Sequence, residues 1–253
     1  MQVFETQKTV RSVHITCSSA KVFLHESDSF KVQVIGGNYD ISVIGESVVI
    51  TPFVPKTENN SVYVGGSGNR VTRIVQNVSG NGNNVIGDVV YGDKINVQNN
   101  YVNQESTEDL IINVYTPKLE TLYTTLKTSQ LTSKTKVNSA YVDLSDSSEI
   151  SLYATNIHAE INRSSNASFT CLGGVLNLEV KGCSAASAYG IGFNFAKVTL
   201  DVSGYSECMT SGIVKGDFQS KATGASRIFH TGRIEGNISR ETRDVSVTTI
   251  KDR

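Results

Sequence analysis

The chain has 253 residues, of which 38% are hydrophobic, so it is long enough to bury a sizeable core as one large domain or two smaller ones. With 23 basic and 24 acidic residues its formal net charge is -1, and this balance supplies no field that would attract nucleic acid or an anionic membrane surface. Because no stretch approaches the roughly 20 apolar residues of a membrane helix, we expect no nucleic-acid partner and no membrane insertion.

The first residues pass directly into an alternating pattern of apolar and polar side chains. They lack the basic start and apolar core of a signal peptide. We therefore expect a cytoplasmic protein as the chain is given, or an extracellular or cell-surface protein if a leader has been removed.

Residues 1–56 predict short strands separated by turns. Apolar and polar side chains alternate around Val13, Val22 and Val32, and Gly45 supplies a turn before the next apolar run. We assign this segment to the first strands or coils of the main domain, with a separate β cap as the alternative.

Residues 57–107 are rich in Asn, Gly, Gln and Val. Gly followed by Asn or Asp recurs every five residues from Gly82, which supplies corners with positive φ between β-prone steps. We predict a Gly/Asn-rich β insertion, a narrow coil or hairpin that packs on the main body or on other copies, because an isolated hairpin is marginally stable. A flexible polar excursion is the alternative. The candidate interface residues are Tyr63, Gly82, Asn83, Val85, Gly87, Asp88, Val90, Tyr91, Gly92, Asp93, Ile95 and Tyr101.

Residues 108–253 repeat with a period near 20 residues. Short alternating strands return to a turn of small residues, which falls in register at Ser147-Ser148, Ser165-Asn166, Cys183-Ser184, Tyr205-Ser206 and Ala225-Ser226. A self-similar period of this length made of strands predicts a solenoid, in which each coil buries its inner face against its neighbours. No capped amphipathic stretch of helical length occurs, so the predicted fold class is all-β.

The order of the segments carries a resemblance to a known family. It rests on residues 11–15, 20–22 and 30–34, on the strand that ends at Ile50, on 114–117, and on the repeats with Ser and Gly at their turns. In this order they resemble the bacterial head GIN domain family, whose members are also described as autotransporter adhesins. The resemblance covers 1–56 and 108–250 and implies a right-handed parallel β-solenoid (β-helix) and export from the cell. Residues 87–95 are similar to short Gly-Asp repeats of bacterial multidomain signalling and conflict proteins, which hints at assembly.

Acidic side chains are the nearest candidates for catalytic groups. Enzymes that cleave glycans use two carboxylates about 5–10 Å apart, and Asp143, Asp146 and Glu149 come closest to such a set. Because they surround a turn, we interpret them as a solvated turn face. An outward acidic column could form from Asp143, Asp201 and either Glu160 or Glu179. Since stacked like charges repel, we expect exposed carboxylates and no enzyme activity.

The other reactive side chains predict no catalytic, cofactor or metal site. Cys17, Cys171, Cys183 and Cys208 show no C-x-x-C spacing, and we expect structural thiols that pack in the stacked coils. His14, His25, His158 and His230 lack the spacing of metal ligands, and no nucleophile elbow occurs.

The leading functional prediction is a non-enzymatic scaffold that self-assembles into a homo-oligomer through 57–107 or through its coil ends. Open coil ends carry unpaired backbone groups, which favour strand addition by another copy. The alternative is an adhesin-like module that binds a glycan or another protein on its outer face. A carbohydrate-active enzyme is the third possibility and would require paired carboxylates on adjacent coils.

Overall fold

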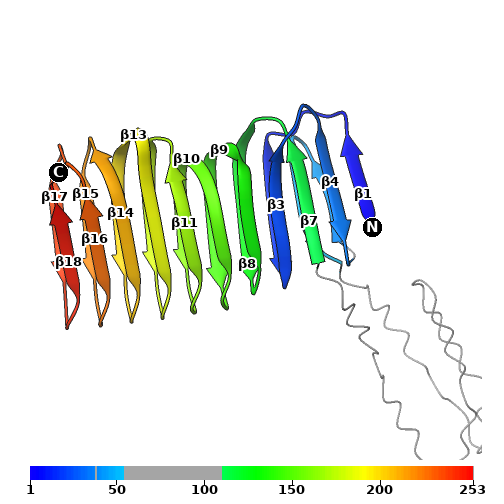
Figure 1. Ribbon diagram of the computed structural model, residues 1–253. Helices are drawn as coiled ribbons and strands as arrows, with labels where there is room; N and C mark the ends of the chain where they lie inside the picture. Colours follow the sequence, from blue (N-terminus) through cyan, green and yellow to red (C-terminus); the bar gives the residue numbers. More distant parts are fainter. Residues whose placement is uncertain (38, 54–109, 253) are drawn as a thin grey trace, which may run out of the picture. The chain divides into compact units, whose positions relative to one another are not determined.

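The computed structural model describes residues 1–37, 39–53 and 110–252, which form eighteen β-strands and no helix (Figure 1). They belong to one compact unit. In this part of the chain, no helix is long and apolar enough to cross a membrane. The prediction of an all-β, mostly parallel solenoid is confirmed, because each coil pairs with the next through parallel strands.

Each coil contributes to two stacks of strands, which we name stack A and stack B. Stack A consists, in spatial order, of β5 (Tyr39–Ile44), β6 (Ser47–Pro52), β2 (Ser12–Ser18), β8 (Leu119–Lys127), the second halves of β9 (Gln130–Ser145) and β10 (Glu149–Ile161), β12 (Gly174–Val180), the second half of β13 (Ala185–Val202), β15 (Phe218–Ala222) and β17 (Ile238–Thr242).

Stack B consists of β1 (Gln2–Thr6), β4 (Phe30–Ile35), β7 (Leu110–Thr116), β3 (Ala20–Glu26), the first halves of β9 and β10, β11 (Asn166–Cys171), the first half of β13, β14 (Glu207–Val214), β16 (Arg227–Thr231) and β18 (Val247–Lys251). Strands β9, β10 and β13 are long enough to bend from one stack into the other.

Antiparallel pairs occur at the N-terminal end of the solenoid. Strand β1 pairs with β4, β4 with β7, and β5 with β6, all in antiparallel register. Strands β2 and β3 form a coil that lies between these strands and the coils that follow in Figure 1. The parallel arrangement therefore begins with β2 and β3 and not with the first strand of the chain.

Alternation of side chains builds the core between the stacks. In β8, Leu122, Thr124 and Leu126 are buried while the residues between them are exposed, as the two-residue period of a strand requires. Phe169, Phe195 and Phe218 are the largest fully buried side chains. Since complete burial of such a side chain stabilises the fold by about 1.5–3 kcal/mol, these positions hold the coils together.

A ladder of buried serines joins stack A to stack B at one edge. It consists of Ser129, Ser148, Ser165, Ser184, Ser206 and Ser226. The backbone N–H of Ser148 donates to Oγ of Ser165 at 3.2 Å, and that of Ser165 donates to Oγ of Ser184 at 3.3 Å. The predicted turn repeat is thus confirmed, with one correction: Ser147-Ser148 aligns with residues 164–165 and not with Ser165-Asn166, because Glu149 pairs with Asn166.

A left-handed turn residue lies two positions before each rung from Ser148 to Ser226, and one position before Ser129. The φ angles are positive at Thr128, Asp146, Arg163, Gly182, Gly204 and Gly224, and the same turn recurs at Asp244, two positions before Ser246. At Gly204 a Cβ would lie 2.7 Å from the carbonyl oxygen of Gly182, so this close approach of successive turns requires glycine. The turns therefore stack as closely as the strands do.

Candidate functional site

The outer face of stack A carries four aromatic rings in one column, which we name the ring ladder. Neighbouring coils place His14 opposite Tyr123, Tyr123 opposite Tyr141, and Tyr141 opposite His158. The ring centroids lie 4.3, 4.9 and 5.2 Å apart and the planes differ by only 16°, 9° and 9°. Each inner ring thus has both faces covered, and solvent reaches mainly the ring edges.

An acidic column runs beside the ring ladder on the same face. Parallel pairing places Asp143, Glu160, Glu179 and Asp201 on successive coils. The column that the sequence allowed is therefore present, and it includes both Glu160 and Glu179. Lys181 pairs with both of these glutamates, and Lys221 approaches Asp201 to 3.3 Å. Three of the four carboxylates thus have a lysine partner.

The environments of the first two carboxylates in this column differ. A hydrogen bond from Asn162 and the charge of Lys181 lower the pKa of Glu160 below its usual value. Partial burial, with a smaller contribution from the charge of Glu160, raises the pKa of Asp143. The two carboxylates therefore titrate in different ranges.

The acidic set named from the sequence is not assembled by the fold. Asp143 points outward from stack A, Glu149 lies in stack B, and Asp146 lies in the turn between them. Asp146 pairs with Arg163 at 3.2 Å and with Lys127 at 3.5 Å. The interpretation as a turn face is confirmed for Asp146, while its two companions belong to opposite faces of the solenoid.

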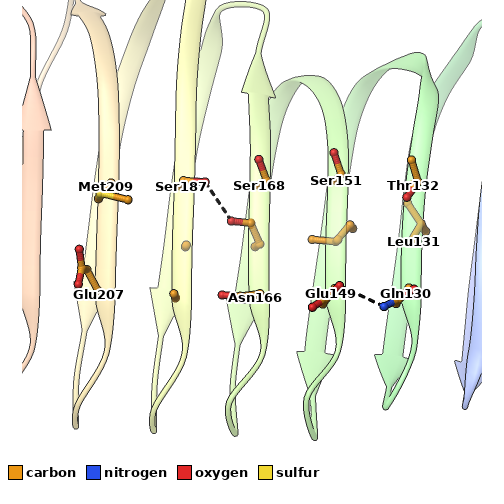
Figure 2. Close-up of a pocket in the computed structure, with 14 residues that line it drawn as sticks. Gln130, Leu131, Thr132, Glu149, Ser151, Asn166, Ser168, Ser187, Glu207 and Met209 are labelled. Carbon is orange, nitrogen blue, oxygen red and sulfur yellow. Dashed lines mark hydrogen bonds between the residues drawn. The ribbon is translucent and has the colours of Figure 1, made fainter.

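The outer face of stack B contains an open groove of about 490 Å³ (Figure 2). Small hydroxyl side chains on four successive coils form its floor: Thr132, Ser151, Ser168 and Ser187. The same column continues at Met209, where a larger side chain replaces the hydroxyls. The depression therefore runs across the strands, from coil to coil.

Polar side chains form one wall of this groove. They are Gln130, Glu149, Asn166 and Glu207, with Ala185 between the last two. The amide of Gln130 donates to Glu149 at 3.1 Å. Glu149 and Glu207 lie three coils apart, which corresponds to roughly 14 Å.

Two tyrosines flank the floor on the other side. Tyr153, Thr170 and Tyr189 occupy the next outward column, two residues along each strand and just outside the groove lining, and Lys136 precedes Tyr153 in that column. Both tyrosines are about as exposed as those of the ring ladder, at 41% and 39%. Because Thr170 separates them, neither ring covers the other, in contrast to Tyr123 and Tyr141.

The groups in the groove make few contacts within the protein. Ser187 donates weakly to the carbonyl oxygen of Ala167 at 3.4 Å. Among the described residues, no hydrogen bond is recorded for the hydroxyls of Thr132, Ser151 and Ser168, and no hydrogen bond or ion pair for the carboxylate of Glu207. These donors and acceptors are free to contact a ligand.

Three cysteines are buried as predicted and one is not. Burial raises the pKa of Cys17 to about 11 and the pKa values of Cys171 and Cys208 to about 12, so these thiols stay protonated and unreactive. Cys183 lies exposed in the turn before Ser184, because the serine takes the buried position of the repeat. All four are free thiols.

The histidines have separate environments. His14 and His158 lie at the two ends of the ring ladder, and His25 stacks on Tyr115 at 4.8 Å. His230 is buried in stack B, where its Nδ1 lies 2.9 Å from Oγ1 of Thr210. Its Nε2 has no partner within the described residues, and burial lowers its pKa. Within that same part of the chain, no cluster of three potential metal ligands forms.

The interface candidates named in the insertion lie outside the described residues. The sequence analysis did not identify the groove or the ring ladder, although the sequence contains every residue that forms them. They could have been identified from the register of the coils. Equivalent residues of successive coils share an outward column only when the turns between the coils are aligned correctly.

Comparisons with known proteins support the fold. No protein-family model matches the chain, and no curated protein matches it in sequence. A crystal structure of a "putative adhesin" from Parabacteroides distasonis is similar over 100% of this chain and 95% of its own, with 8% identity and a TM-score of 0.51. A "putative adhesin" from Bacteroides fragilis covers the same shares with 10% identity and a TM-score of 0.48. A "putative lipid binding protein" from P. distasonis covers 100% and 96% with 13% identity and a TM-score of 0.42. The chain is thus similar in fold to the first of these structures.

Proposed function

We propose that this protein is a non-enzymatic, adhesin-like binding module that holds a glycan on the outer face of stack B. The observation that carries the proposal is the groove floored by Thr132, Ser151 and Ser168, whose hydroxyls have no recorded partner among the described residues. Glycan hydroxyls both donate and accept hydrogen bonds, and serine and threonine hydroxyls do the same. A row of such side chains therefore suits a polyhydroxylated ligand.

The carboxylate geometry favours binding over catalysis. Glu149 and Glu207 line the groove at roughly 14 Å, beyond the 5–10 Å that glycan cleavage requires. Asp143 and Glu160 do lie on adjacent coils, but Lys181 holds Glu160 in an ion pair and the pair projects from the face that carries the ring ladder. We therefore assign no turnover to either face.

The neighbours' names agree with a role at the cell surface. The P. distasonis structure with the TM-score of 0.51 is named as an adhesin. Under this proposal the present chain also acts at the surface or outside the cell, and the resemblance of residues 11–15 and 30–34 to the head GIN domain family belongs to the same proposal.

A glycan array tests the proposed function. We expect the purified full chain to bind a subset of immobilised glycans, and to leave the chain length of the bound glycans unchanged after prolonged incubation. Absence of binding to all glycans would refute the binding role, while shortened products would refute the non-enzymatic part.

Self-assembly is the second candidate function, and the last coil favours it. Strands β17 and β18 pair with no further strand in the described residues. Ile238, in register with the buried Phe218, is 48% exposed there. An unpaired strand edge with exposed apolar side chains favours addition of a second copy.

Light scattering across a dilution series tests this second candidate. A defined oligomer is expected, and Ile238→Lys should weaken it because the charge opposes strand addition. A deletion of 57–107 tests the route through the insertion in the same way. A monomer at all concentrations would refute self-assembly.

A further inference from the structure

The geometry points to one class of ligand for the groove: we propose that it binds an unbranched, non-acidic glycan chain that lies parallel to the solenoid axis. This inference rests on the proposed function, and it adds the direction, the width and the charge of the ligand.

The floor of the groove sets the direction. Thr132, Ser151 and Ser168 repeat once per coil, and coils are spaced by about 4.8 Å along the axis. An extended chain of pyranose rings advances by about the same length per sugar. Each sugar can therefore meet one floor hydroxyl, whereas a chain that followed a strand would leave the row after one residue.

The width of the groove limits the ligand to one chain. Wall and floor columns are two residues apart along a strand, which is about 6.6 Å. Glu149 and Tyr153 thus lie on either side of Ser151 along the strand, so a ligand that contacts Ser151 is bounded by one column on each side. A branch at each sugar would meet one of these walls, so the groove favours an unbranched chain.

The charge of the groove selects against acidic sugars. Its lining includes Glu149 and Glu207 but no Lys, Arg or His, and the nearest cations lie just outside it, Lys136 beside Tyr153 and Arg227 one coil beyond Glu207. A carboxylate accepts hydrogen bonds from hydroxyl, amide or ammonium groups and repels the carboxylate of a uronic acid. Neutral and amino sugars should therefore bind more tightly than uronic acids.

The tyrosine wall offers apolar contact to the same chain. Tyr153 and Tyr189 stand two coils apart with Thr170 between them, so their ring faces are not covered by each other. Tyrosine rings supply rigid contact area with a polar tip, which suits the C–H face and the hydroxyls of a sugar.

An extended peptide fits this surface less well. A peptide that adds to a sheet uses the free backbone groups of an edge strand. Here β10 and β11 already pair with strands on both sides, so the floor presents side chains only. Peptide binding is thus an outcome of the test and not part of the proposal.

Calorimetric titration of the full chain tests the inference with three named probes: cellohexaose, chitohexaose and hexagalacturonate. Ser168→Tyr fills the floor, and Thr199→Tyr makes a similar change at an outward position of stack A. We expect at least one of the first two probes to bind, hexagalacturonate to bind at least about tenfold more weakly, and Ser168→Tyr to weaken binding at least about tenfold. Thr199→Tyr should leave binding unchanged, and circular dichroism should show both variants folded.

Several results would overturn the inference. If a probe binds and Ser168→Tyr has no effect, the glycan role stands but the groove is not its site. Tighter binding of hexagalacturonate than of both other probes would refute the charge selection. Binding only of an extended peptide, such as a hexamer of alternating Ser and Thr, would refute the ligand class. Binding of none of the probes would refute the inference, and the glycan array would then decide separately whether the proposed function stands.

Discussion

The two outer faces of the solenoid have similar residue types but use them differently. Stack A carries two tyrosines between two histidines, stacked ring on ring, beside carboxylates that pair with lysines. Stack B has one stacked pair, His25 and Tyr115, at its N-terminal end, but around the groove it carries two tyrosines that Thr170 keeps apart, beside carboxylates that have no cationic partner in the groove lining.

This difference separates stabilising side chains from available ones. A group that contacts its neighbour on the next coil contributes to the stacking of coils and offers little to a ligand. A group without such a contact contributes little to stability and keeps its hydrogen-bonding capacity for a partner. We therefore assign external support to the face of stack A and, under the proposed function, recognition to the groove region of stack B.

The largest expected effects come from the core that both faces share. Phe169 and Leu178 lie fully buried below the two faces, and each truncation to alanine should lower the free energy of unfolding by about 2–5 kcal/mol. Urea denaturation monitored by circular dichroism measures the free energy of unfolding of both variants. A cost below about 1 kcal/mol for either would contradict a continuous core.

Tyrosine truncation on each face should separate the two roles. Tyr141→Ala removes a ring stacked on both sides and should cost about 1–3 kcal/mol in the free energy of unfolding, without a change in glycan affinity. Tyr153→Ala should cost within about 0.5 kcal/mol and should weaken glycan binding several-fold. Denaturation and titration of both variants give the comparison, and the reverse pattern would overturn the division of roles.

Acidification should act on the interior before it acts on either face. Burial lowers the pKa of His230, so the unfolded chain takes up a proton that the folded chain resists, and stability should fall as the pH drops below the unfolded value of about 6.5. The expected result is a melting temperature that decreases between about pH 7 and pH 5. His230→Leu should flatten this dependence, and an equal slope in both proteins would contradict it.

Asp143 should act with the opposite sign and at lower pH. Its raised pKa means that the folded chain binds the proton more readily than the unfolded chain, so protonation of Asp143 stabilises the fold as the pH falls towards the unfolded value of about 3.9. Asp143→Asn should remove this part of the pH dependence, and melting curves over that range measure it.

The smallest effects should come from surface ion pairs. Lys181→Met removes the partner of Glu160 and Glu179, and because all three side chains are more than 40% exposed the cost should be within about 1 kcal/mol at low salt and smaller at high salt. Glu149→Gln on the other face should change stability less. Denaturation of both variants at two ionic strengths measures these effects. If the loss of stability in Lys181→Met did not depend on salt, its origin would not be electrostatic.

The sequence alone determined that the chain is all-β and built of stacked coils. Alternation at Leu122 and Leu126 and the recurring Ser turns are local patterns, and each predicts its own strand or corner without knowledge of the neighbours. The acidic column was also visible, since Asp143, Glu160 and Glu179 hold similar places relative to their turns.

The tertiary structure alone decided which side chains share a column. Successive rungs of the serine ladder are separated by 17 to 22 residues, so no single period aligns the coils. A slip of one residue moves a side chain to the opposite face, as the alignment of Ser165 with Ser147 would have done. The ring ladder and the groove exist only in the correct register. For that reason the architecture could be predicted from the sequence, while the proposed recognition surface could be located only after the coils were stacked in register.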